Sequence, residues 1–76
     1  MSKRRQPIDA AVGKRLAAAR QTAGLTQAEL AQRSRLDQPS ISKIERGLQS
    51  LGARRAKALA TVLKIDPAVL LWGRQS

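Results

Sequence analysis

Helix start and stop signals follow one another closely near the middle of the chain, and they restrict this stretch to two short helices. Thr26 and Glu29 have the spacing of a capping box, in which each side chain accepts a hydrogen bond from the backbone amide of the other residue. Asp37 is placed to cap the next helix, and Pro39 falls in its first turn, where the missing N–H has no partner to lose. The two helices are therefore joined by a tight turn at residues 34–36.

Three further helices are predicted on either side of this pair. The first has Asp9 as its cap, and its apolar face consists of Val12, Leu16, Ala19 and Ala23. The fourth opens at Ser50 or Gly52, and its apolar stripe consists of Ala53, Ala56, Leu59, Ala60 and Leu63. The fifth is short and follows Asp66-Pro67, which supplies a cap and a first-turn proline.

The central pair offers its own apolar residues for burial, namely Ala28, Leu30, Ala31, Ile41 and Ile44. Small aliphatic side chains dominate the composition and Trp72 is the only aromatic residue, which favours close-packed short helices over a sheet. A chain of 76 residues supports one domain. We therefore predict an all-α fold, a compact five-helix domain over residues 9–72, with a basic flexible arm at 1–8 and a tail at 73–76.

Charge and missing residue types narrow the function. A net charge of +10 favours a polyanionic partner, above all nucleic acid. The absence of Cys and His removes disulfides, the usual zinc ligands and the usual general acid–base residue, so we expect no enzyme, metal or cofactor. The apolar run Ala68–Trp72 is too short to span a bilayer, and the first residues are not a secretory signal. We expect a soluble, cytoplasmic protein without a membrane partner.

The segment QAELAQRSRLDQPSISKIERG, which begins at Gln27, resembles the helix-turn-helix of lambda-repressor-like proteins, the Cro/CI-type or XRE family. The matching positions are Gln27, Leu30-Ala31, Ile41, Ile44 and Glu45-Arg46-Gly47. The similarity extends from Leu16 through Leu71. It implies a DNA-binding transcriptional regulator in which the second and third helices form the helix-turn-helix, the third being the reading helix.

An α-helix fits the major groove of B-DNA with its N-terminal side chains close to the base edges. That geometry makes four residues candidates for base reading: Gln38, Pro39, Ser40 and Lys43. Gln38 suits a bidentate contact to adenine and matches a base-reading glutamine of the family, although it is also an ordinary first-turn residue. Ser40 is suited either to a phosphate or to the Asp37 cap. Lys43 is suited either to guanine or to a phosphate.

The candidates for contacts to DNA phosphates are Thr26, Gln27, Ser42, Arg46, Arg54 and Arg55. The resemblance assigns such a contact to Gln27, and the three arginines are candidates because they flank the connection after the reading helix. Gln27 lies at a helix N-terminus, where free amides attract anions, but it is equally a good helix former. Each of the three arginines is otherwise a solvated surface charge. Arg20 and Glu45 correspond to a structural ion pair in the family, which holds the first helix against the reading helix.

Three places depart from the family pattern. Leu51-Gly52 stands where many relatives have Pro-Ser before the fourth helix. Arg35 stands where the turn usually has a left-handed glycine, and an arginine in that conformation costs roughly 1–2 kcal/mol. Ser34 replaces a usual apolar residue and is expected to thin the core locally. The variant segment Ser34–Asp37 resembles that of restriction–modification controllers in the same superfamily.

One such domain contacts few base pairs, so family resemblance implies a homodimer on a near-palindromic operator. Leu70, Leu71 and Trp72 are the candidates for its interface; the alternative is that the two leucines complete the core and Trp72 covers an edge. A repressor is the favoured function, with an antitoxin that has a toxin partner or a restriction–modification controller as close variants. A basic RNA-binding protein or a membrane-active cationic helix fits less well, because stacking aromatics are scarce and each capped helix has its own apolar stripe.

Overall fold

The computed structural model describes residues 8–73, which form five helices. These are α1 (Ile8–Thr22), α2 (Gln27–Ser34), α3 (Gln38–Glu45), α4 (Ala53–Leu63) and α5 (Pro67–Trp72). The predicted all-α five-helix fold is confirmed. The expected arm, apart from Ile8, and the expected tail, apart from Gly73, lie outside the described residues. Within the described range no helix is both long and apolar enough to cross a membrane.

Most helix boundaries are set by the predicted caps. The Thr26–Glu29 capping box is formed in both directions, and Asp37 accepts a hydrogen bond from the Ser40 amide. The prediction for Asp9 was wrong, since α1 begins at Ile8 and Asp9 therefore lies in its first turn. Its carboxylate instead accepts a hydrogen bond of 3.2 Å from the Ser50 hydroxyl, which ties the start of α1 to the loop before α4.

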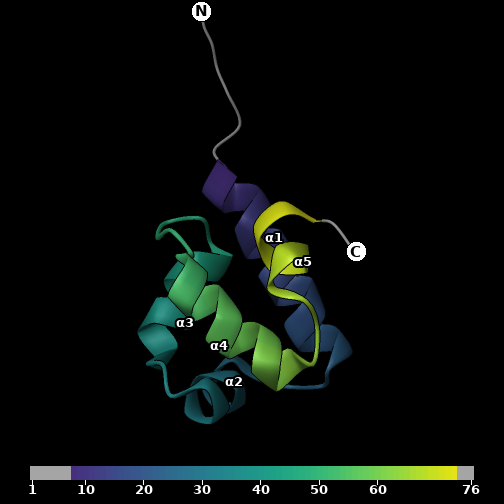
Figure 1. Cartoon of the computed structure of the whole chain (residues 1–76). Coiled ribbons are helices and arrows are strands. Elements are labelled where there is room, and N and C mark those ends of the chain that lie inside the picture. The colour runs from purple at the N-terminus through teal and green to yellow at the C-terminus, as the bar shows by residue number, and fades with distance from the viewer. Residues whose placement is uncertain (1–7, 74–76) are drawn as a thin grey trace, which may run out of the picture.

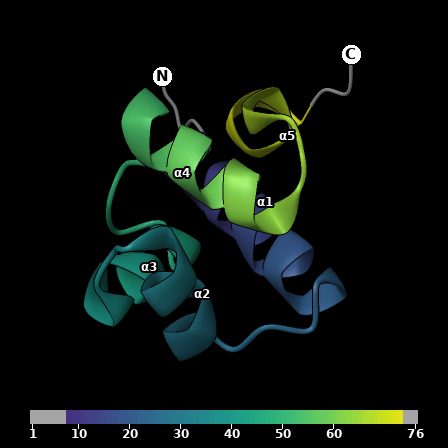
Figure 2. The same cartoon turned by 60° about the horizontal axis from the view of Figure 1, so that its bottom comes forward.

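The helices enclose a single core. α1 packs against α3 and α5, α4 packs against α5 and α2, and α2 packs against α3 (Figures 1 and 2). The buried apolar residues are Val12, Leu16, Leu30, Ala31, Ile41, Ile44, Leu51, Ala56, Leu59, Ala60, Leu63 and Leu70. Three alanines predicted on apolar faces are exposed. Ala23 lies beyond the end of α1, and Ala28 and Ala53 lie in the first turns of α2 and α4, where no neighbouring helix covers them.

Candidate nucleic-acid interface

The turn between α2 and α3 is built on a left-handed arginine. Arg35 has φ 64° and ψ 30°, and its amide donates to the carbonyls of Ala31 and Gln32 at the end of α2. The Leu36 amide also donates to the Ala31 carbonyl, at 3.0 Å. Ser34 is buried, and its hydroxyl donates to the Leu30 carbonyl at 2.7 Å, so the polar group is satisfied inside the helix. The chain thus reverses into α3 within a few residues, and α2 and α3 lie side by side (Figure 2).

α3 has one face in the core and another in solvent. Ile41 and Ile44 are fully buried, which fixes the rotation of the helix about its axis. Gln38, Pro39 and Lys43 are exposed. The predicted base-reading residues other than Ser40 therefore point into solvent from the first two turns of a helix that the core holds in place.

Ser40 is engaged by the cap of α3. Its hydroxyl donates to Asp37 Oδ1 at 2.9 Å and its amide donates to Oδ2 at 3.1 Å. Of the two roles considered for Ser40, the structure contains the contact with the cap. The Asp37–Ser40 pair orders the first turn of α3, from which Gln38 projects.

The Asp37 cap predicts a dependence of stability on pH. The hydrogen bonds from the Ser40 side chain and backbone hold the pKa of Asp37 below its ordinary value. The stabilisation is therefore complete above the unfolded pKa of about 4, and it disappears as pH falls through the lower folded value. Urea unfolding followed by circular dichroism between about pH 7 and pH 2.5 should show a smaller loss of stability for Asp37→Asn than for the wild type. Equal losses in the two proteins would show that the cap carries no such linkage.

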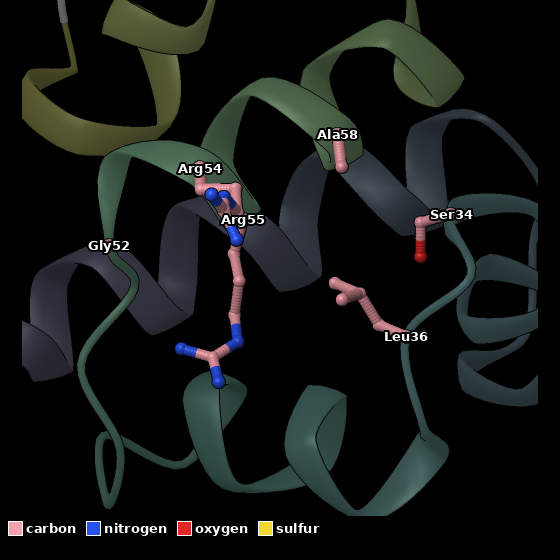
Figure 3. Close-up of a pocket in the computed structure, with 6 residues that line it drawn as sticks. All are labelled: Ser34, Leu36, Gly52, Arg54, Arg55 and Ala58. Atoms are coloured by element: carbon pink, nitrogen blue, oxygen red, sulfur yellow. The ribbon is translucent and has the colours of Figure 1, made fainter.

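Among the predicted phosphate-contacting residues, Thr26, Arg46, Arg54 and Arg55 are exposed, whereas Gln27 and Ser42 are half-buried. The Thr26 hydroxyl accepts the Glu29 amide at 3.0 Å within the capping box. Arg54 and Arg55 lie in the first turn of α4, and Figure 3 shows the Arg55 side chain reaching toward α3. Thr26 is the cap before α2 and Arg46 the residue after α3, so the exposed residues lie at the ends of the two helices of the helical pair and at the start of α4.

An ion pair lies beneath this surface. Arg20 Nε donates to Glu45 Oε2 at 2.7 Å, and a second guanidinium nitrogen donates to Oε1 at 3.1 Å. A third nitrogen of Arg20 donates to the Leu25 carbonyl at 2.8 Å. These contacts with Glu45 raise the pKa of Arg20 above its ordinary value. The pair joins the end of α1 to the end of α3, and Arg20 is committed to that role.

Gln27 has a structural contact that sequence reasoning missed. Its side-chain nitrogen donates to Glu45 Oε1 at 2.9 Å, so it completes the hydrogen bonding of the buried carboxylate. One N–H of the amide remains for another acceptor. A glutamine at a helix start gives no sequence signal for a partner eighteen residues later on another helix.

Gly13 was also missed, although a glycine inside a helix is a recognised signal of close packing. It is buried at the crossing of α1 and α3, where a Cβ atom would lie 2.6 Å from the Glu45 carbonyl oxygen and closer still to that of Ile44. Only a residue without a side chain permits this approach. Gly13 thus sets the spacing between α1 and the end of the reading helix.

The three residues predicted for a dimer interface differ in exposure. Leu70 is fully buried in the core, so its assignment to an interface was wrong: it completes the packing of α5. Leu71 is half-buried against the core, and Trp72 is 67% exposed. Arg15 holds this helix in place by donating to the Leu70 and Leu71 carbonyls at 3.0 and 2.9 Å. Trp72 is the exposed residue of α5, while Pro67, Ala68, Val69 and Leu71 are half-buried.

Two short capped helices that meet at a tight turn, the second with exposed polar side chains at its start, define a helix-turn-helix DNA-binding protein. The net charge of +10 supplies the attraction to phosphates that this class requires. A family model described as helix-turn-helix matches residues 16–70. The chain belongs to this family, and its resemblance to XRE-type regulators is confirmed.

Solved structures of regulators are similar over most of the chain. The restriction-modification controller protein C.AhdI from Aeromonas hydrophila is 35% identical, with a TM-score of 0.79, and the match covers 82% of this chain and 94% of that chain. The clp gene regulator ClgR from C. glutamicum is 27% identical, with a TM-score of 0.81 and coverage of 88% and 87%. A mutant of the controller protein C.Esp1396I is 27% identical, with a TM-score of 0.76 and coverage of 87% and 88%. None of the curated proteins compared with the chain matches it.

Proposed function

We propose that the protein is a sequence-specific transcriptional repressor that binds a near-palindromic operator as a homodimer. The observation that carries the proposal is the exposure of Gln38, Pro39 and Lys43 on a helix whose opposite face, Ile41 and Ile44, is fully buried. A helix fixed in this way can present the same side chains to the same base edges in every complex. In this proposal Gln38 reads adenine and Lys43 reads guanine.

Phosphate contacts then set the register of the helix in the groove. We assign them to the exposed side chains of Thr26, Arg46, Arg54 and Arg55, together with the half-buried Gln27 and Ser42. Gln27 contributes the N–H that Glu45 leaves unused. Each of these contacts strengthens binding without selecting a sequence, because phosphates are alike at every base pair.

A controller of restriction–modification genes is a second candidate, favoured by the similarity to two such controller proteins, C.AhdI and C.Esp1396I. C.AhdI, the controller protein that is 35% identical, aligns over 94% of its own length. The variant turn Ser34–Asp37 supports the same assignment. The genes adjacent to this one distinguish the two candidates, since a controller is expected beside a methyltransferase and an endonuclease gene.

The Gln38→Ala variant tests base reading. Selection of binding sites from random duplexes should return relaxed preference at one position of each half-site, with a loss of about 1–3 kcal/mol against the preferred base. Gln21→Ala, at an exposed position in the last turn of α1, is the matched control and should return the wild-type sequence. Identical selections from the wild type and Gln38→Ala would remove Gln38 as a base-reading residue. A wild type that selects no sequence, or prefers single-stranded RNA, would overturn the proposed function.

The Trp72→Ala variant tests the homodimer. Trp72 is 67% exposed, and tryptophan is enriched among the residues that contribute most to binding at protein interfaces. Sedimentation should show a dimer for the wild type and a shift toward monomer for Trp72→Ala. Leu48→Ala is the control, because Leu48 is 65% exposed but lies in the loop after α3. A monomeric wild type, or equal dissociation in both variants, contradicts the assignment.

A further inference from the structure

An open pocket lies between the first half of α4 and the α2–α3 turn (Figure 3). Its volume is about 520 Å³, and it is lined by Ser34, Leu36, Gly52, Arg54, Arg55 and Ala58. Pockets that hold small organic molecules have volumes of about 300–1,000 Å³. The space is therefore large enough for a small ligand rather than for a single ion.

The pocket is open because three of its lining residues are small: Ser34, Gly52 and Ala58. The Ser34 hydroxyl donates to the Leu30 carbonyl at 2.7 Å, so its hydrogen-bonding capacity is used within α2. Gly52 has an ordinary φ of −74°, and a Cβ atom built on it would meet nothing within 4 Å. Neither backbone conformation nor crowding therefore requires a glycine at this position, and its lack of a side chain leaves the mouth of the pocket clear.

The walls of the pocket divide into an apolar and a cationic part. Leu36 and Ala58 supply aliphatic surface, and Figure 3 shows the Leu36 side chain directed into the space below α4. Arg54 and Arg55 supply two guanidinium groups, and neither forms an ion pair or donates a hydrogen bond to another residue of the 8–73 range. The nearby Asp37 carboxylate is charged and attracts Arg55, but it forms no ion pair with either arginine, and its oxygens accept hydrogen bonds from Ser40.

We propose that this pocket binds a small amphipathic anion, with its carboxylate or phosphate group on Arg54 and Arg55 and its aliphatic part against Leu36 and Ala58. Guanidinium groups bind such anions by paired, charge-assisted hydrogen bonds. Burial of the aliphatic part adds affinity in proportion to the apolar area covered. The uncapped N-terminus of α4 at Gly52 adds favourable electrostatic potential at the same end of the pocket.

Occupancy has a consequence for DNA binding, and this part rests on the proposed function. Arg54 and Arg55 are also the proposed phosphate contacts of α4. An anion in the pocket engages the same guanidinium groups, so it lowers the affinity of the protein for duplex DNA. The pocket lies beside the reading helix and leaves Gln38 untouched, so the ligand weakens binding without changing the sequence preferred.

Octanoate is a suitable probe of the pocket. Octanol serves as a control without the charge, and acetate serves as a control without the aliphatic chain. Titration of the ¹⁵N-labelled full chain should give saturable amide shifts at Leu36, Gly52 and Ala58 with octanoate and much smaller ones with octanol or acetate. Arg54→Gln combined with Arg55→Gln should weaken octanoate binding about tenfold or more. The matched control is Lys57→Gln with Lys64→Gln, which removes the same charge from exposed positions outside the pocket.

The proposed ligand site would be overturned if octanoate caused no amide shifts, or if the two double variants weakened octanoate binding equally. In the second case Arg54 and Arg55 would bind octanoate no better than other surface charges do. The second arm measures wild-type affinity for a selected duplex with and without saturating octanoate, with octanol as control. A lower affinity with octanoate alone supports the competition, and an unchanged affinity overturns it. The titration uses no DNA. If the protein failed to bind any duplex, that result would contradict the proposed function but not the proposed binding of an anion in the pocket.

Discussion

The Gly13→Ala variant is expected to lose about 3 kcal/mol of the free energy of unfolding, because the added methyl group would enter the backbone of α3. A Cβ atom at this position would lie 2.6 Å from the Glu45 carbonyl oxygen and 2.9 Å from the Glu45 carbonyl carbon. Backbone atoms at a helix crossing have no rotamer to change, so α1 and α3 must separate. Urea unfolding followed by circular dichroism measures the loss.

Helix propensity alone predicts that Gly13→Ala increases stability, so the sign of the change distinguishes the two effects. Inside a helix alanine is favoured over glycine by about 1 kcal/mol. Ala18→Gly, at an exposed position of the same helix, is the control and should lose about that amount. A Gly13→Ala protein that is as stable as the wild type or more stable would contradict the close approach. A destabilised but folded Gly13→Ala protein should also bind DNA more weakly, because the end of the reading helix has moved.

The sequence was sufficient for the features that depend on neighbouring residues. The Thr26–Glu29 box and the Asp37 cap follow from local backbone chemistry, and both are present. The left-handed Arg35 is also present, but it was expected from the family resemblance. The error at Asp9 has the same origin, since a cap and a first-turn acid differ by one residue and both suit a helix start. Local signals identify an end but place it only to within a turn.

Features that depend on the packing of helices were less predictable. Leu70 and Trp72 are two residues apart in one short helix, yet one is fully buried and the other is 67% exposed. The apolar character of both residues did not distinguish the core from an interface. Arg15 is one of fifteen basic residues, and nothing in the sequence distinguishes the one that holds the end of α5 from those that face solvent.

The position of the reading helix depends on three contacts with the rest of the domain. Ile41 and Ile44 fix its rotation, and Gly13 fixes its distance from α1. The Arg20–Glu45 pair fixes its C-terminal end. None of these residues is proposed to touch DNA, but each determines where Gln38 is held. Variants that weaken DNA binding must therefore be separated into those that remove a contact and those that displace the helix.

The Arg20–Glu45 pair is expected to show the second large effect. Arg20→Met should lose about 3 kcal/mol, because it leaves the Glu45 carboxylate, whose side chain is only 6% exposed, with Gln27 as its one remaining side-chain donor. The value lies at the lower end of the range for buried pairs since the Arg20 side chain is itself 14% exposed. Urea unfolding measures this loss, and Arg33→Met, at an exposed position on α2, should change stability by no more than about 0.5 kcal/mol.

A double-mutant cycle separates the interaction between Arg20 and Glu45 from the other contributions that each side chain makes to stability. Arg20→Met combined with Glu45→Leu removes both charges, so it should recover much of the stability that either single change loses. The stability of Arg20→Lys should lie between that of the wild type and that of Arg20→Met. One ammonium group cannot reproduce the guanidinium geometry that donates to both Glu45 oxygens and to the Leu25 carbonyl. Additive losses in the cycle, or an Arg20→Met protein no weaker than Arg33→Met, would mean that α3 is held by its apolar face alone. Coupling between the two positions would instead show that a buried charge on the last turn of the reading helix is tolerated because α1 supplies its counterion.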